Sequence, residues 1–201
     1  KVEIEITCPT CPRFIPAKAT TSVAPNGLET VTNKGTLIVK VFSASGQPIS
    51  GANISIVNNS VNPVININNL TDADGVLKLV DIATSSVGYS ITATRAGYST
   101  DKTYPPGGPS NPNPLKPHVT VLEQQTTEIS FIIDRVSTLN VRTQNEFCSG
   151  VGSIDFLQIG QKIIGTNPDV FKFSATNNTN VSGDRSVTNL EFDAYTFLNQ
   201  D

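Results

Sequence analysis

The sequence predicts an all-β chain that folds into two tandem β-sandwiches, and three observations support this. Apolar residues recur at every second position in most segments from Thr36 onward, and no segment sustains the period of a helix. Turn signals such as Gly46-Gln47-Pro48 and Ala73-Asp74-Gly75 separate these segments. The whole arrangement then occurs a second time. Because a single sheet would leave one apolar face in water, paired sheets are expected.

The repeat sets the domain boundaries. Four segments recur in the same order about a hundred residues later, which indicates two copies of one unit. We expect residues 1–34 to form an N-terminal strand and leader, 35–134 a first sandwich and 135–201 a second. The matching segments are 36–41, 52–56, 71–75 and 88–91 in the first copy, and 138–142, 152–156, 179–183 and 194–197 in the second.

The second copy is expected to lack its last strand. The first copy continues through Gly97-Tyr98 to a final strand, whereas the second stops at Asp201, where its own Gly-Tyr pair would come. Two explanations stay open. Either a larger parent chain continues beyond this point, or another molecule supplies the strand.

The N-terminal residues alternate like a half-buried strand. Val2, Ile4 and Ile6 fall on one side and glutamates and a threonine on the other. Prolines then punctuate the chain as far as Pro25, so residues 8–34 are expected to be an extended leader. An amphipathic strand on such a leader could insert into a neighbouring subunit, which makes these three residues donor-strand candidates.

A second proline-rich stretch lies inside the first copy. Residues 104–117 contain too many prolines to form a strand, because proline cannot donate to a β-ladder. We expect an excursion there, after which residues 119–133 return to the sheet as a last strand or a hairpin. Residues 134–137 then join the two copies in so few residues that their relative motion is restricted.

Composition excludes several classes of partner. The net charge is −3 with no cluster of Lys and Arg, so no nucleic-acid partner is expected. No apolar run is long enough for a membrane-spanning helix, and no basic amphipathic stretch suits a membrane surface. The expected partners are proteins or further copies of this chain, and no cofactor is expected.

The three cysteines are disulfide candidates. Cys8 and Cys11 lie among prolines, which favours a structural disulfide over redox chemistry, because a reactive thiol needs a helix N-terminus. Oxidation of that pair would leave Cys148 without a partner in this chain. A zinc ribbon would need a second pair of ligands.

Catalytic and metal-binding interpretations are weak. His118 is the only histidine and no nucleophile motif accompanies it. Asp72-Ala73-Asp74-Gly75 begins like a calcium loop but has Ala83 where the twelfth-position glutamate should stand, so a turn is favoured in which Asp accepts backbone amides. The pairs Glu191/Asp193 and Glu3/Glu5 each share one face of a strand, and solvated faces explain them. No enzymatic activity is expected.

Five asparagines satisfy the Asn-x-Ser/Thr pattern of N-glycosylation. Several such matches arise by chance in a chain rich in Asn, Ser and Thr. The candidates are Asn53, Asn58, Asn69, Asn177 and Asn180.

One stretch carries a family resemblance. Gly46-Gln47-Pro48-Ile49-Ser50-Gly51-Ala52-Asn53-Ile54, followed by Thr71-Asp72-Ala73-Asp74-Gly75, Tyr89 and Gly97-Tyr98, resembles the carboxypeptidase regulatory-like and Cna B-type domain superfamily. The resemblance covers residues 36–133, and 138–201 in degenerate form. It implies an Ig-like or transthyretin-like β-sandwich without catalytic activity, used as a stalk or spacer in exported bacterial surface and pilin-like proteins.

The same resemblance raises the question of an isopeptide bond. Some Cna B-type domains join a lysine to an asparagine, and Lys40 stands on the first strand. The family's Glu-Thr-x-Ala-Pro segment is absent, and the second copy has Arg142 at the matching position, which cannot act as that nucleophile. The alternative is a solvent-facing Lys40.

Three functions therefore compete. The first is a non-enzymatic structural or adhesive module of an extracellular or cell-surface protein, with its loops as contact surfaces. The second is a subunit of a pilus-like filament assembled by donor-strand exchange through residues 1–7. The third is an accessory carbohydrate- or protein-binding module, which would need Tyr98, Tyr104 and Tyr195 on one exposed face.

Overall fold

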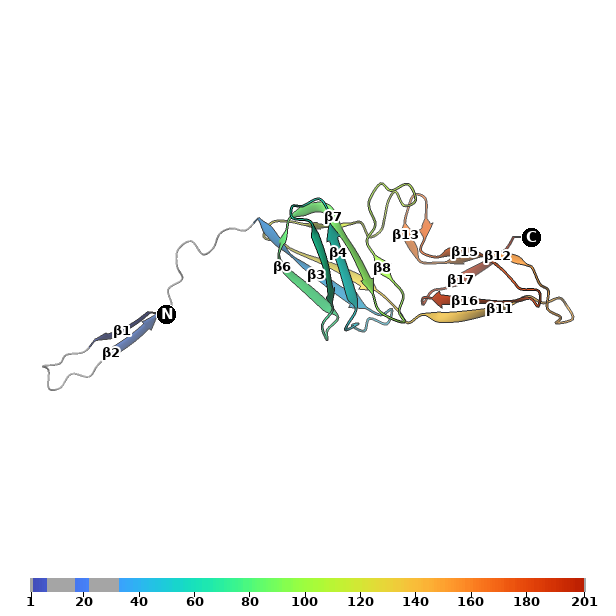
Figure 1. Cartoon of the computed structure of the whole chain (residues 1–201), viewed down its shortest axis with the longest axis horizontal. Coiled ribbons are helices and arrows are strands. Elements are labelled where there is room, and N and C mark those ends of the chain that lie inside the picture. The colour runs from blue at the N-terminus through green and yellow to red at the C-terminus, as the bar shows by residue number, and fades with distance from the viewer. Residues whose placement is uncertain (1, 7–16, 22–32, 201) are drawn as a thin grey trace. The chain divides into compact units, whose positions relative to one another are not determined.

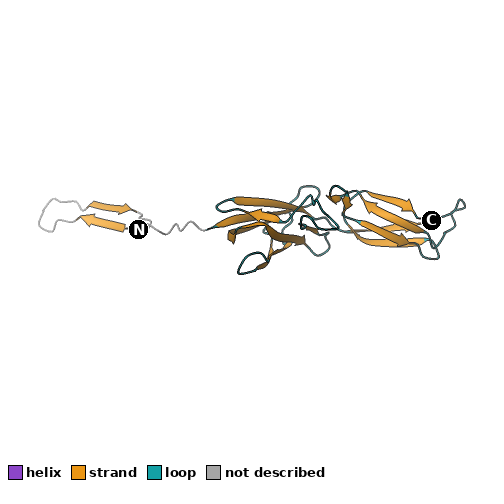
Figure 2. Cartoon of the chain, turned by 90° about the horizontal axis from the view of Figure 1, so that it is seen from above, coloured by secondary structure: helices purple, strands orange, loops and turns teal. Residues whose placement is uncertain are grey.

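The chain is all-β, as the alternation of its residues predicts. In the computed structural model, which describes residues 2–6, 17–21 and 33–200, those residues form strands joined by turns and loops, with no helix among them (Figure 2). The chain divides into two compact units, Lys1–Thr32 and Asn33–Asp201. The described residues also contain no helix that could span a membrane.

The first unit contains a two-stranded antiparallel ribbon. Strand β1 (Val2–Ile6) pairs with β2 (Ala17–Thr21), with Val2 opposite Thr21 and Ile6 opposite Ala17. The expectation of an extended leader over residues 8–34 was therefore wrong for residues 17–21. These five residues lie between Pro16 and Pro25, include no proline and end in two threonines, so they can donate to a ladder and favour β structure.

The first half of the second unit, residues 33–133, is a sandwich of two sheets (Figure 1). One sheet has the order β10-β3-β6 and the other β5-β4-β7-β8, with β9 also pairing with β7. The bounds are β3 (Lys34–Phe42), β4 (Asn53–Asn58), β5 (Ile65–Leu70), β6 (Val76–Ala83), β7 (Ser85–Thr94), β8 (Asp101–Lys102), β9 (Val119–Val121) and β10 (Thr126–Ile132).

The core of this half comes from alternate residues of facing strands. Leu37, Val39 and Val41 of β3 are fully buried, while the residues between them are partly exposed. Ile54 and Ile91, on the opposing sheet, are also fully buried. Each such side chain contributes about 1.5–3 kcal/mol on leaving water, which is why the period-two pattern dictates the sandwich.

Residues 119–133 form neither a single strand nor a hairpin. They form two strands, but β9 pairs with β7 in one sheet and β10 with β3 in the other. Strand β10 runs parallel to β3, with Phe131 beside Val41. Phe131 and, directly after the strand, Ile133 are fully buried, so this segment both covers the edge of β3 and fills the core.

The second half, residues 137–200, has three sheets of two or three strands each. These are β11-β16, β15-β12-β17 and the ribbon β13-β14. Among its described residues, Phe156, Val187 and Leu190 are the buried apolar ones. The bounds are β11 (Ser137–Arg142), β12 (Asp155–Gly160), β13 (Ile163–Gly165), β14 (Val170–Phe171), β15 (Ser174–Asn178), β16 (Asp184–Leu190) and β17 (Tyr195–Asn199).

The same hydrogen bonds recur in both halves. The Thr71 amide donates to the Ala52 carbonyl and the Ala52 amide donates to Thr71 Oγ1, both at 2.9 Å. Thr179 and Ile154 exchange the same two bonds at 3.0 Å. Ile154 is therefore the counterpart of Ala52. The sequence comparison, which placed Gly152 there, was two residues out of register.

The turn after each of these threonines is also the same. Asp72 Oδ1 accepts the amides two and four residues later, at 3.0 and 2.9 Å. Asn180 Oδ1 accepts the equivalent pair, both at 2.9 Å. Gly75 and Gly183 complete the turns with φ of 70° and 84°. Glycine is favoured in this backbone region because it has no Cβ. The expectation that Asp72 caps a turn is confirmed.

Candidate functional site: the junction of the two halves and an open groove

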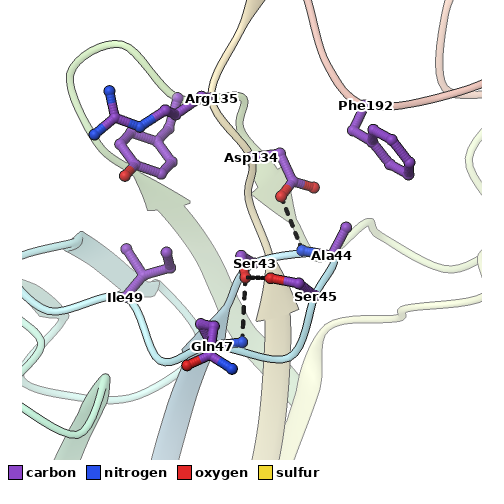
Figure 3. A pocket seen from close by; sticks show the side chains of 9 residues that line it. Ser43, Ala44, Ser45, Gln47, Ile49, Asp134, Arg135 and Phe192 are labelled. Carbon is purple, nitrogen blue, oxygen red and sulfur yellow. Dashed lines mark hydrogen bonds between the residues drawn. The ribbon is translucent and has the colours of Figure 1, made fainter.

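The linker between the halves is hydrogen-bonded to the first half along its length. The Ser99 amide donates to the Asp134 carbonyl at 2.7 Å, and the Val136 amide donates to the Gly97 carbonyl at 3.1 Å. Asp134 Oδ1 also accepts the Ala44 amide at 2.8 Å, as Figure 3 shows. Asp134 therefore fixes the linker to a turn at the end of the first sandwich.

A cleft of about 570 Å³ opens beside this linker (Figure 3). One wall is the turn around Gln47, and Phe192 of the second half, 73% exposed, contributes to the lining. The guanidinium groups of Arg95 and Arg135 lie 4.9 and 5.6 Å from the ring centroid of Tyr98. The cleft presents apolar and hydroxyl groups together with the carboxamide of Gln47, the carboxylate of Asp134 and the guanidinium of Arg135.

The proline-rich excursion makes a second attachment. As its prolines predict, residues 104–117 contain no extended strand, and they pack against β13 of the second half. The Leu115 amide donates to the Ile164 carbonyl at 2.9 Å, and Asn111 Nδ2 donates to the same carbonyl at 3.1 Å. The Thr166 amide donates to the Asn113 carbonyl at 3.0 Å. A segment of the first half is thus hydrogen-bonded to the second.

Charged groups accumulate next to this attachment. Lys116 Nζ lies 2.5 Å from Asp101 Oδ2, on the first half. On the second half, the side chain of Glu191 is 8% exposed, and its Oε2 accepts a hydrogen bond from Lys172 Nζ at 2.7 Å. Lys162 Nζ lies 3.7 Å from the same oxygen. Both carboxylates have cationic partners, as buried charges require.

Two tyrosines are affected by this environment. Burial, with Asp193 and Glu191 nearby, raises the pKa of Tyr195 to about 12. Burial, with Asp101 and Glu191 nearby, also raises the pKa of Tyr104. Both phenols therefore stay neutral at ordinary pH, and the Tyr195 hydroxyl donates to the Glu191 carbonyl at 3.0 Å.

An open groove lies at the other end of the second half. It has a volume of about 430 Å³ and runs between β11 and the sheet of β12 and β17. Strand β11 pairs with β16 along one edge, and no described strand pairs with its other edge. The lining residues are Val141, Thr143, Gln144, Val151, Ile154, Phe156, Phe197 and Asn199.

The cysteine candidates are not brought together by the described structure. Cys8 and Cys11 lie outside the described residues. Cys148 is an exposed free thiol. Its amide donates to the Asn145 carbonyl at 3.0 Å, as the Gly46 amide does to Ser43 at 2.9 Å, so Cys148 occupies the counterpart of a glycine position, with φ of 59°.

The glycosylation candidates divide by accessibility. Asn58 and Asn177 are buried, at 0% and 6% exposure. Asn53, Asn69 and Asn180 are exposed, and for them modification stays a prediction.

The other singled-out residues have structural partners. His118 Nδ1 lies 3.0 Å from Thr103 Oγ1, and burial lowers the pKa of the imidazole. Lys40 Nζ donates to Glu128 Oε2 at 2.7 Å on the partly exposed face of the sheet. Among the described residues, no group of three His, Cys, Asp or Glu could hold a metal ion.

The tyrosines singled out for sugar stacking do not form one exposed platform. Tyr98 packs against the guanidinium groups of Arg95 and Arg135, and Tyr195 packs edge-on against Phe173 with ring centroids 5.5 Å apart. Tyr104 lines a different cleft, of about 530 Å³, with Lys102 Nζ 5.3 Å from its ring centroid. The flat surface that sugar stacking needs is therefore not assembled.

No family model matches this chain, and no curated protein matches it. Solved structures with a similar arrangement include the Bacillus anthracis TIE protein, at 15% identity and a TM-score of 0.39, over 84% of this chain and 28% of that one. A streptococcal ancillary pilin is 11% identical with a TM-score of 0.37, over 86% of this chain and 55% of that one. The Lactobacillus rhamnosus GG shaft pilin SpaA is 11% identical with a TM-score of 0.36, over 84% of this chain and 94% of that one. The chain thus spans about a quarter and about half of the first two.

Proposed function

We propose that this chain is a non-enzymatic structural module of an extracellular or cell-surface protein, in which two copies of one β-sandwich are held in a fixed relation. The observation that carries the proposal is the double attachment of the two halves. The linker is bonded to the first half through Asp134, and the excursion of the first half is bonded to β13 of the second.

Two separate attachments restrict motion more than either does alone. A single short linker still allows rotation about its backbone torsions, whereas a second set of hydrogen bonds at a distance from it removes that freedom. Each bond contributes only about 1 kcal/mol, but the excursion supplies several to the same ribbon. A spacer or stalk needs this resistance to bending.

Placement outside the cell rests on the sequence resemblance to Cna B-type domains and on a sequence rich in Ser, Thr and Asn. Protease treatment of intact cells tests it. Cleavage of the chain without lysis is the expected result, and full protection until lysis would contradict an exterior location.

Rigidity is tested by spin labels at the exposed positions Asn59 and Asp169, one in each half. The native cysteines are first replaced by serine. We expect a single narrow distribution of distances between the labels. A broad distribution would show that the halves move independently and would refute the spacer function.

A second candidate function is a subunit of a pilus-like filament assembled through residues 1–7. The specific observation that favours it is the unpaired edge of β11, among the described strands, beside an apolar groove. An accessory carbohydrate-binding role has no comparable support, because the three candidate tyrosines are partly buried and do not line one common cleft.

A further inference from the structure

The groove of the second half corresponds to a filled part of the first. The registers of β4 with β7 and of β12 with β17, together with the shared turn hydrogen bonds, align the two halves residue by residue. The counterparts of Val141, Thr143, Ile154, Phe156 and Phe197 are Val39, Val41, Ala52, Ile54 and Ile91, and all five counterparts are 0% exposed.

Strand β10 makes the difference between the two halves. In the first half it lies parallel to β3 and places Phe131 in the core, and Ile133, directly after the strand, is also fully buried. In the second half no described strand occupies the corresponding edge of β11. As a result Phe197 is 42% exposed, whereas its counterpart Ile91 is fully buried.

The geometry of the first half specifies what would fill the groove. The occupant must be extended, must run parallel to β11 and must place apolar side chains at alternate positions, as Ile129 and Phe131 of β10 and the following Ile133 do. Val2, Ile4 and Ile6 have the same spacing, with three apolar residues at every second position.

Strand β1 also has an edge available. It belongs to a two-stranded sheet in which β2 pairs with one side only, so among the described residues its other edge has no partner. A two-stranded ribbon alone is marginal in water, and addition to a third strand would stabilise it. Strand β1 can therefore join β11 without leaving β2.

Charge supports one register. On β10, Ser130 lies beside Lys40 of β3. Alignment of Val2 with Ile129 puts Glu3 at the position of Ser130, and the counterpart of Lys40 on β11 is Arg142. Arg142 is exposed and its Nε is 3.7 Å from Asp184 Oδ1, so its guanidinium can donate to a further acidic partner. Glu3 would then lie beside Arg142.

We propose that the groove along β11 binds residues 2–6 of another molecule of this chain, as a strand parallel to β11 with Glu3 next to Arg142. This deepens the second candidate function and rests on it. Each molecule would donate β1 and accept β1 through different surfaces, and such heterologous contacts propagate head to tail.

The test is sedimentation velocity of the full chain under reducing conditions over a wide range of concentration. The chain is expected to form head-to-tail oligomers. Ile4→Asp should weaken association on the order of 100-fold, since it puts a charge against an apolar groove. Glu3→Arg and Arg142→Glu should each weaken it about threefold, and the two together should restore it. Asp74→Arg, an exposed charge reversal in a turn of the first half, is the matched control.

Hydrogen exchange of the β11 amides identifies the occupied edge. Protection that grows with oligomerisation, and is lost in Ile4→Asp, supports the proposal. Oligomers insensitive to Ile4→Asp, or charge reversals that do not compensate, would overturn it in favour of another surface. A monomer with unprotected β11 would show an empty groove, and a monomer with protected β11 would show a different occupant. Each overturns the proposal, and none changes the label distances that test the spacer.

Discussion

Gly165 is the position where one methyl group should release the attachment between the halves. A Cβ added there would overlap the carboxamide of Asn111, with the Cγ atom only 2.7 Å away. Asn111 is 6% exposed and donates to the Ile164 carbonyl at 3.1 Å. Gly165→Ala must therefore displace the carboxamide within its buried site and break this hydrogen bond.

The magnitude follows from the groups involved. The lost hydrogen bond contributes about 1 kcal/mol, and leaving the buried carboxamide without a partner adds about 1–3 kcal/mol. The docking of the excursion should thus weaken by about 2–4 kcal/mol, while the sandwich cores stay intact because Gly165 lies outside both. The effect should be on local opening and not on global unfolding.

Hydrogen exchange at the Leu115 amide measures this opening, since that amide donates across the junction to Ile164. We expect exchange to accelerate by about 30-fold or more in Gly165→Ala, because the rate follows the free energy of local opening. Gly108→Ala is the matched control in the same excursion, because its added Cβ would make ordinary contacts of 3.6 Å or longer. Unchanged exchange in Gly165→Ala, or equal acceleration in the control, would refute the reasoning.

Three further outcomes are expected. Thr179→Val should lower the free energy of unfolding in urea by about 2 kcal/mol, because a buried amide loses its acceptor. Thr179 is 1% exposed and its hydroxyl accepts a hydrogen bond from the Ile154 amide. An unchanged free energy of unfolding would show that this hydrogen bond does not stabilise the turn. The pKa of Tyr195 is raised from 10.0 to about 12, so the neutral phenol should stabilise the fold fully below pH 10, and this stabilisation should be lost as pH rises through 12. Unfolding measured as a function of alkaline pH should show this loss, and Tyr195→Phe should abolish it. Lys172→Met should destabilise by about 3 kcal/mol in the same urea assay, because it leaves a buried carboxylate poorly paired. Glu191 would keep only the weaker contact to Lys162, and an unchanged midpoint would contradict the importance of the ion pair.

Local patterns predicted the strands and turns well. The recurrence of apolar Leu37, Val39 and Val41 at every second position is enough to specify a strand with one buried face. Asp72 followed by Gly75 is enough to specify the turn. These features depend on neighbours in the chain, so a sequence displays them directly. The all-β class follows for the same reason.

Features that depend on distant residues were not accessible. Strand β2 lies in a proline-rich part of the sequence, and it pairs with β1, which is more than ten residues away in the chain. The parallel pairing of β10 with β3 and the docking of Asn111 on Ile164 likewise join residues far apart in sequence. The two-residue error at Ile154 arose because similar apolar letters recur at every second position, so a shift by two preserves the pattern.

The groove was anticipated only in outline. The repeat in the sequence directs attention to the last strand of the second copy, but it does not say which edge of that half is open. The hydrogen bonds of Thr71 and Thr179 align the halves, and this alignment identifies the edge of β11.

The most direct test of the central claim is a set of residual dipolar couplings from the backbone amides of residues 34–133 and 137–199 in weakly aligned solution. If the two halves form one rigid spacer, both sets of couplings must fit a single alignment tensor with the orientation seen in the structure. Two tensors of different magnitude would show that the halves reorient independently, and the proposed function would then be wrong.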